Sequence, residues 1–533
     1  MLFNSYEFLF AFLPVTLVGF FLLGRWGWRD AAIAWLVAAS LFFYGWWNPP
    51  YLLLLLGSIL FNFCLGGWLS GTREKGAPYR RPTLVGGILV NLVSIGYFKY
   101  ANFFIDNLNV IGGTDFHFGV IILPLAISFF TFQQITFLVD SYRGLASEHG
   151  FLNYCLFVSF FPQLIAGPIV HHSEMLPQFA RSTTFRFKPG NVTVGMTIFA
   201  LGLFKKAVLA DGIAVYANPV FSAAEAGQTI AFFEAWAGAL AYTFQLYFDF
   251  SGYSDMALGA ARMFGILLPV NFNSPYKATN IIEFWRRWHI TLSRFLRDYL
   301  YIELGGNRKG RYRRYVNLMS TMLLGGLWHG AGWTFVAWGA LHGFYLVINH
   351  GWHALRRTMN GGAVQQSTGL GRRAGQLLTF VAVVVGWVFF RAPTLDSALR
   401  ILEGMAGLNG VSIPMALSTR LGNLAETLSA LGVQFTPGGG AEFLFGWSWI
   451  AALSLIAFVM PNSLDLTRRY RPALHYRFDG LTAIDLSFLS RITWTIAALR
   501  WRPNTVWAAF AAMLITGGVL ALPQVSEFLY FQF

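Results

Sequence analysis

The sequence contains few charged residues for its length. Only 12% of the 533 residues are Asp, Glu, Lys or Arg, whereas 56% are hydrophobic. A soluble protein of this size needs far more polar residues to cover its surface. Together with a mean hydropathy of +0.52, this composition excludes an ordinary soluble globular protein.

Cysteine and several enzyme motifs are also scarce or absent. The two cysteines, Cys64 and Cys155, lie in apolar segments, which excludes a disulfide framework and predicts packing roles. The chain has no GxSxG motif of serine hydrolases. The segment 305–310, GGNRKG, is too short for a phosphate-binding Walker motif and is typical of a turn.

The net charge of +14 comes from basic residues in short loops between apolar runs. This distribution follows the positive-inside rule, and with no basic soluble domain present we expect no nucleic-acid partner. The rule places the N-terminus in the periplasm and the loops 25–30 and 72–81 in the cytoplasm. It also places 461–504 in the cytoplasm and 393–442 outside.

Apolar runs of membrane-spanning length dominate the rest of the chain. Examples are residues 50–70, 83–98 and 443–460, and residues 6–24 are expected to be a retained first span. The fold class predicted is therefore an all-α polytopic integral membrane protein. We expect one domain over residues 1–533, with N-terminal spans in 1–122, a catalytic core in 123–350 and C-terminal spans in 351–533.

Two core segments do not fit simple crossings of the membrane. Residues 160–170, FFPQLIAGPIV, contain two prolines and a glycine, which predicts a re-entrant element buried in protein. Residues 315–350 are too long for one span and have basic flanks, so they should enter the membrane and return. We expect about eleven to thirteen membrane segments in total, besides interfacial amphipathic helices.

Residues 281–300, IIEFWRRWHITLSRFLRDYL, are predicted to form one amphipathic helix at the membrane interface. One face would hold Trp285, Trp288 and His289, and the other Arg286, Arg287, Arg294 and Arg297. In one interpretation the arginines meet lipid phosphates and His289 is a satisfied core residue. In the other, His289 lines a cavity and the arginines attract a phosphate-bearing substrate.

The stretch 326–333, GLWHGAGW, places His329 in a segment that should lie within the bilayer. A buried neutral imidazole can accept a proton from a hydroxyl, and the surrounding glycines allow close helix approach or a tunnel. A histidine hydrogen-bonded between packed helices is the alternative. On one straight helix, His342 would lie about 20 Å further along, which argues against a shared site or a metal pair.

Other histidines and the acidic residues point to no further site. His350 and His353 stand beside basic residues and are expected at the interface, so no metal is predicted. Asp211, Asp249 and Asp255 could support a transporter or could pair with neighbouring helices.

Several long segments resemble the membrane-bound O-acyltransferases in their bacterial, polysaccharide-acetylating branch. They are PLAISFFTFQQITFLVDSYRG, FFPQLIAGPIV, QLYFDFSGYSDMALG, FWRRWHITLSRFLRDYLY, LGGNRKG and GLWHGAGWTFVAWGALHG, which together span residues 123–343 in the order of that branch. The resemblance implies a ring of tilted helices around a thin centre. It also implies a principal histidine at His329, in the WHG motif, and a second histidine at His289.

The resemblance further implies the transfer of an acetyl group from cytoplasmic acetyl-CoA across the bacterial inner membrane. The acceptor would be an extracytoplasmic polysaccharide, alginate-like or cellulose-like, or a periplasmic partner of the SGNH type working with a polysaccharide synthase. His329 would act as general base or carry the acetyl group, and His289 would orient the thioester or stabilise charge. No cofactor is expected, since acetyl-CoA is a substrate.

The expected substrate-binding residues surround these two histidines. Arg286, Arg287, Arg294 or Arg308 would hold the phosphates of the donor, and the remaining contacts are assigned to Trp285, Trp288, Trp328 and Gly330. Two other functions stay open. One is a transporter of an acyl donor or lipid-linked saccharide, with Asp249 and Asp255 as coupling groups, and the other is a scaffold without catalysis.

Overall fold

A computed structural model describes residues 1–72, 77–117, 119, 121–146, 150–359, 361, 368–477, 499–524 and 529. The described chain is helical apart from one small sheet, which confirms the all-α prediction. Parts of the basic segments 72–81 and 461–504 lie outside the described residues, as does most of the terminal SEFLYFQF.

Six described helical stretches are long and apolar enough to cross a membrane, which confirms a polytopic membrane protein. These stretches are Phe8–Arg25, Pro50–Gly71, Arg80–Gly112, Pro189–Glu225, Gly369–Arg391 and Gly440–Phe458. The first, Phe8–Arg25, covers most of the predicted N-terminal span 6–24. The expected total of about eleven to thirteen membrane segments also counts core helices that are less apolar. That total stays a prediction.

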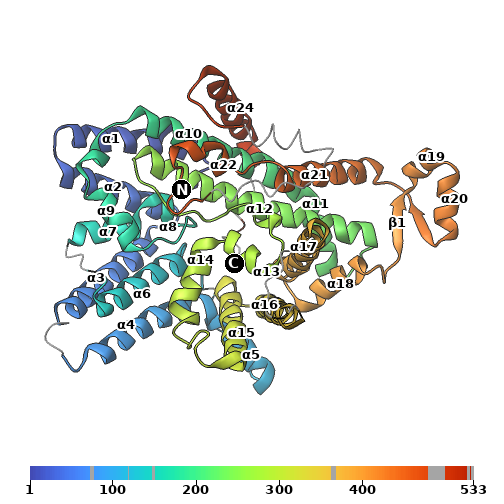
Figure 1. The fold of residues 1–533 in the computed structure, drawn as a ribbon, viewed down its shortest axis with the longest axis horizontal. Helices are drawn as coiled ribbons and strands as arrows, with labels where there is room; N and C mark the ends of the chain where they lie inside the picture. The colour runs from blue at the N-terminus through green and yellow to red at the C-terminus, as the bar shows by residue number, and fades with distance from the viewer. Residues whose placement is uncertain are drawn as a thin grey trace.

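The N-terminal helices lie side by side at the blue end of the chain (Figure 1). Their bounds are η1 (Phe8–Phe12), α1 (Leu13–Arg25), α2 (Arg29–Gly45), α3 (Pro50–Gly71), α4 (Arg80–Ile95), η2 (Gly96–Tyr100) and α5 (Ala101–Gly112). Here η2 is a π-helical stretch within an almost continuous helix from α4 to α5. Cys64 is exposed and Cys155 is buried, so the packing role predicted for Cys64 is wrong.

The core helices surround a centre formed by α13 and α14 (Figure 1). Their bounds are α6 (Ile127–Arg143), α7 (Phe151–Ser159), α8 (Phe161–Leu164), α9 (His172–Phe179), η3 (Ser182–Phe185), α10 (Pro189–Phe204), η4 (Lys205–Ala210), α11 (Asp211–Glu225), α12 (Phe232–Met263), η5 (Pro275–Lys277), α13 (Ile281–Arg287), α14 (Ile290–Phe295), η6 (Leu296–Tyr301), α15 (Gly310–His329) and α16 (Trp333–Met359). Residues 160–170 are broken and wholly buried, as the two prolines predicted.

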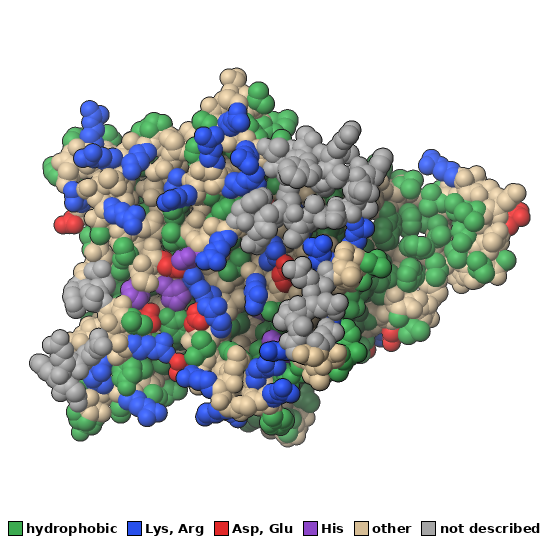
Figure 2. Space-filling model, viewed as in Figure 1, with side chains coloured by type: hydrophobic (Ala, Val, Ile, Leu, Met, Phe, Trp, Pro, Cys, Tyr) green, Lys and Arg blue, Asp and Glu red, His purple; other side chains and the backbone are tan. Residues whose placement is uncertain are grey.

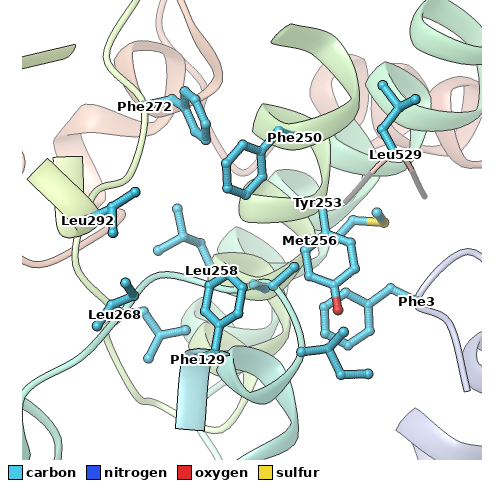
Figure 3. Close-up of a cluster of buried hydrophobic side chains, with 14 of the residues drawn as sticks. Phe3, Phe129, Phe250, Tyr253, Met256, Leu258, Leu268, Phe272, Leu292 and Leu529 are labelled. Atoms are coloured by element: carbon cyan, nitrogen blue, oxygen red, sulfur yellow. The ribbon is translucent and has the colours of Figure 1, made fainter. Parts of the chain in front are cut away.

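Most residues of the long helix α12 are buried. It approaches α10 closely because glycines face each other, and a Cβ on Gly202 would lie 2.5 Å from the carbonyl oxygen of Gly252. Phe250, Tyr253 and Met256 of α12 join side chains from distant segments in the cluster of Figure 3. Leu292 of α14 belongs to this cluster, so the central helices are anchored to α12.

The C-terminal third adds further helices and a projecting lobe. The bounds are α17 (Gly369–Arg391), α18 (Leu395–Met405), β1 (Val411–Pro414), η7 (Met415–Leu417), α19 (Ser418–Leu421), α20 (Asn423–Ala430), β2 (Val433–Thr436), α21 (Gly440–Phe458), α22 (Ser463–Thr467), η8 (Arg468–Tyr470), α24 (Thr505–Ala521) and η9 (Leu522–Gln524). Strands β1 and β2 pair in parallel, with Val411 opposite Val433. Lys and Arg side chains spread over the body in Figure 2, whereas the lobe is largely hydrophobic.

Candidate active site

His329 is the last residue of α15, at a sharp reversal of the chain. The helix ends where the Gly330 amide bonds the Gly326 carbonyl, and α16 begins at Trp333 and runs back along α15. A Cβ on Gly326 or Gly339 would overlap backbone of the facing helix, so these glycines permit the close contact. Residues 315–350 reverse direction as predicted, their entry into the membrane stays a prediction, and His329 is only 7% exposed.

His289 lies where the predicted amphipathic helix breaks. The prediction of one continuous helix over 281–300 is wrong. His289 has φ +41° and separates α13 from α14. A left-handed conformation costs a non-glycine residue free energy, and such strain is typical of functional positions. Trp288 and His289 are buried as predicted, whereas Arg287 is also buried and does not face water as expected.

Asn271 determines which nitrogen of the His289 ring carries the hydrogen. The backbone N–H of Thr291 donates to Asn271 Oδ1 at 3.3 Å, which identifies that atom as the oxygen. The same oxygen lies 3.0 Å from His289 Nδ1, so Nδ1 must be the donor. In the neutral ring, Nε2 then carries the lone pair and is the basic nitrogen.

The Trp328 ring packs against both predicted histidines. It lies 4.8 Å from the ring of His329 and 6.2 Å from that of His289. Trp338 and Phe390, each 5.1 Å from His329, close the other side of that imidazole. The structure therefore brings His289, His329 and Trp328 together in one buried aromatic site.

His342 also belongs to this site, contrary to the sequence argument. Its ring is 4.8 Å from Trp338, the residue that also contacts His329. The expected separation of His329 and His342 holds only on one straight helix. The chain instead reverses at Gly330, which brings His342 back alongside α15. His342 is fully buried, and within the described part of the chain neither ring nitrogen has a hydrogen-bond partner.

The predicted tryptophans and Gly330 take different positions. Trp288 packs 4.8 Å from Trp387 and 5.0 Å from Phe272, as a core residue does. Trp285 lies 5.2 Å from His342 and its indole nitrogen has no partner among the described residues. The space beside Gly330 is filled by the Phe335 ring, so the clearance expected there for an acyl chain is taken by a side chain.

Two of the predicted phosphate-binding arginines are engaged by carboxylates. Arg294 forms a two-pronged ion pair with Glu174, with distances of 2.8 and 3.0 Å. Burial would raise the pKa of Glu174, but the charge and hydrogen bonds of Arg294 outweigh it and hold this pKa below its usual value. Glu174 is therefore ionised and occupies the guanidinium fork that a phosphate would need.

The other arginines differ in availability. Arg287 pairs with Glu283 at 2.8 Å and also donates to the carbonyl of Asn273. Arg286 is exposed, and Arg308 donates to the carbonyl of Ile302 at an exposed position. Arg286 and Arg308 are thus the more accessible of the four residues for a phosphate-bearing ligand.

A basic pocket that was not predicted lies at the far end of the α15–α16 hairpin. It encloses about 510 Å³, and the residues that line it are Arg311, Arg314, Tyr315, His350, His353, Ala354, Arg357 and Thr358. No carboxylate lines it. The arginine spacing in 311–314 was visible in the sequence, but its meeting with α16 depended on the hairpin.

Lys99 is a second residue that sequence analysis missed. Its Nζ donates to the carbonyls of Trp328 at 2.5 Å and His329 at 3.0 Å, and the neighbouring Tyr100 hydroxyl donates to Leu327 at 2.6 Å. These bonds satisfy carbonyls that the end of α15 leaves without intrahelical donors. A lone lysine inside an apolar span was the signal available in the sequence.

The acidic residues considered for transport are tied in ion pairs. Lys206 Nζ lies 2.7 Å from Asp211 and 2.8 Å from Asp249, and Lys205 lies 2.7 Å from Asp255. These pairs link η4 to α11 and α12, as the packing alternative expected. Within the described chain no group of three His, Cys, Asp or Glu residues could hold a metal ion.

The fold and this site define an integral membrane protein with a buried cluster of histidines and aromatic side chains. The sequence model of the membrane-bound O-acyltransferase family matches residues 123–385. A peptidoglycan O-acetyltransferase of Helicobacter pylori is 48% identical over 443 residues, which cover 78% of this chain and 81% of that protein. A probable alginate O-acetylase of Pseudomonas aeruginosa is 44% identical over 414 residues, covering 76% of this chain and 75% of that protein.

A teichoic acid D-alanyltransferase of Streptococcus thermophilus is more distant, at 30% identity over 44% of this chain and 59% of that protein. These similarities extend over most of the chain in the two nearer relatives. The chain belongs to the membrane-bound O-acyltransferase family and is an O-acyltransferase.

Proposed function

We propose that this enzyme transfers an acetyl group from cytoplasmic acetyl-CoA across the bacterial inner membrane. The acceptor is the hydroxyl of an extracytoplasmic polysaccharide or the serine of a periplasmic SGNH-type partner that works with a polysaccharide synthase. The observation that supports this most strongly is the pair of buried imidazoles, His289 and His329, which both pack against Trp328.

The position of His329 supports transfer across the membrane. His329 lies eighteen residues beyond Arg311 on one helix, about 27 Å at 1.5 Å per residue. Arg311 lines the basic pocket, whose charge suits the phosphates of CoA. Under the positive-inside rule this end faces the cytoplasm. A donor bound there by its phosphates would extend its thioester arm towards His329.

The reaction that we propose is a direct acyl transfer. His329 takes the proton of the acceptor hydroxyl while the hydroxyl oxygen attacks the thioester carbonyl carbon. The carbon–sulfur bond breaks, the thiolate of CoA leaves, and the proton held by His329 neutralises it. His289 stays neutral and, with Nδ1 held by Asn271, keeps a fixed orientation toward the reacting centre.

The proposal is tested with the purified enzyme reconstituted in sealed lipid vesicles and supplied from outside with acetyl-CoA that carries a labelled acetyl group. We expect free CoA thiol and labelled ester on the acceptor to appear in equal amounts. A membrane fraction with periplasmic extract supplies both acceptor types. Movement of intact acetyl-CoA into sealed vesicles, without thiol release, would contradict the proposal and favour a transporter.

A further inference from the structure

An apolar groove of about 900 Å³ lies between α1 and the segment that joins η3 to α10. The apolar side chains that line it come from both elements and are Pro14, Leu17, Val18, Phe21, Leu22, Phe185, Phe187 and Val192. Phe21 and Phe187, one from each wall, pack with their ring centroids 5.5 Å apart. Val18, Leu22 and Phe187 are exposed, so the groove is open to the surroundings of the protein.

The groove has about the depth of one membrane leaflet. On α1, which belongs to a membrane-spanning stretch, Arg25 lies eleven residues beyond Pro14, about 16 Å. This is about half of the roughly 30 Å hydrocarbon core of a bilayer. Trp26 and Trp28 follow directly and are exposed, as aromatic residues at a membrane–water interface are. The groove therefore runs from the interface towards the middle of the bilayer.

Two arginines stand at the interface end of the groove because the chain turns sharply there. Arg25 is the last residue of α1, and Arg29 is the first residue of α2. Gly27 lies between them with φ +82°, a left-handed conformation that favours glycine and commonly ends a helix. The turn brings both guanidinium groups to the lining of the same groove.

A third arginine comes from the opposite wall. A Cβ on Gly24 would lie 2.5 Å from the carbonyl oxygen of Phe185, so this wall meets α1 at its last turn. Arg186 follows Phe185 directly and lines the groove. Asp30 lines a neighbouring cavity and not this one.

The charge at this end of the groove has no counter-charge within the protein. Arg25, Arg29 and Arg186 are exposed, and among the described residues none of them pairs with a carboxylate. Lys and Arg side chains lie over the region that α1 and α2 occupy, as Figure 2 shows. An apolar groove with free guanidinium groups at one end suits a ligand with a hydrocarbon chain and an anionic head.

We propose that this groove is a binding site for an anionic phospholipid of the cytoplasmic leaflet, of the phosphatidylglycerol type. The phosphate accepts hydrogen bonds from Arg25, Arg29 and Arg186, and one acyl chain lies along α1. The positive-inside rule places the loop 25–30 in the cytoplasm, on the side of this leaflet. A zwitterionic phospholipid fits less well, because its own ammonium competes with the arginines for the phosphate. The bound lipid joins the N-terminal span to the core of the protein.

The experiment uses the full chain in a neutral detergent and counts bound phospholipid by native mass spectrometry. Phosphatidylglycerol is compared with phosphatidylethanolamine that carries the same acyl chains. We expect the unchanged protein to bind phosphatidylglycerol about tenfold more tightly. The combined variant Arg25→Gln, Arg29→Gln and Arg186→Gln should lose this preference while its binding of phosphatidylethanolamine stays the same.

A matched control removes the same charge at three exposed positions that do not line the groove, as Arg81→Gln, Arg372→Gln and Arg420→Gln. This control should keep the preference. Equal binding of the two lipids by the unchanged protein would overturn the inference, since ordinary lipid around a membrane protein is unselective. A preference that survives in the groove variant, or that is lost equally in the control, would also overturn it.

A further variant tests the apolar part of the groove. Val18→Trp fills the groove and leaves the arginines in place, so both lipids should bind several-fold more weakly. Unchanged binding in Val18→Trp would contradict the position of the acyl chain. No acetyl-CoA is present in these measurements, so their outcome is independent of the proposed function.

Discussion

At the scale of single residues, Gly330 shows how closely the chain packs around the candidate base. Its φ of −160° is extended and open to any residue, so only space restricts this position. That space is occupied by the Phe335 ring, which packs 5.2 Å from Phe390. Phe390 in turn contacts His329, so a side chain at position 330 displaces the wall of the site.

We therefore expect Gly330→Leu to lower acetyl transfer roughly 10²-fold while the protein still accumulates in the membrane. The measurement is transfer of labelled acetyl at matched protein levels. A second change, Phe335→Ala, vacates the same volume and should restore part of the activity. Full activity in Gly330→Leu alone would show that transfer does not depend on the packing of Phe335 and Phe390 beside His329.

Residue spacing predicted the histidines but not their surroundings. His329 and His289 could be chosen from the sequence, since each stands in an aromatic, glycine-rich or amphipathic setting. His289 is held by Asn271, eighteen residues earlier, and no local pattern reveals that contact. Lys99 was missed for the same reason, because its partners lie more than two hundred residues away.

At the scale of elements, ion pairs rather than apolar contacts alone join η4 to its neighbours. Lys205 pairs with Asp255 of α12, and the Ser463 hydroxyl donates to the same carboxylate oxygen at 2.6 Å. Both charged side chains are largely buried, so removal of one leaves the other without compensation.

We expect Asp255→Asn to destabilise the protein by roughly 3 kcal/mol or more, as breaking a buried pair does. Transfer per folded molecule should change little, because the Asp255 carboxylate bonds Lys205 and Ser463 and not the two candidate histidines. The check is thermal unfolding in detergent beside transfer at matched levels of folded protein. The double variant Lys205→Met with Asp255→Leu should regain stability. Normal stability with lost transfer in Asp255→Asn would point instead to a coupling role.

The hairpin of α15 and α16 could be predicted because its length and flanking charges required a return. The position of His342 in the site could not be predicted, since its contact with Trp338 depends on where the chain turns. The break within 281–300 could not be predicted, because the apolar residues of α13 and α14 follow the same helical periodicity along the sequence. A periodic pattern constrains which residues are buried, but it does not show whether the helix is continuous.

At the scale of the whole molecule, the candidate donor pocket and the candidate histidines lie at opposite ends of α15. The basic pocket lies at one end of α15, and Lys99 contacts the other end through the carbonyls of Trp328 and His329. Composition alone predicted the membrane and the distribution of charge. The three-dimensional arrangement adds that His329 lies at the end of α15 that Lys99 contacts, about 27 Å along the helix from Arg311 of the basic pocket.

The central claim is that His329 performs the proton transfer, and one measurement tests it most directly. His329→Ala is compared with His117→Ala, a matched change at an exposed histidine remote from the site. Both variants, at equal and confirmed membrane levels, are supplied with labelled acetyl-CoA and acceptor. We expect His329→Ala to transfer label roughly 10²–10⁴-fold more slowly, with His117→Ala unaffected. Transfer at the full rate by His329→Ala would contradict the account.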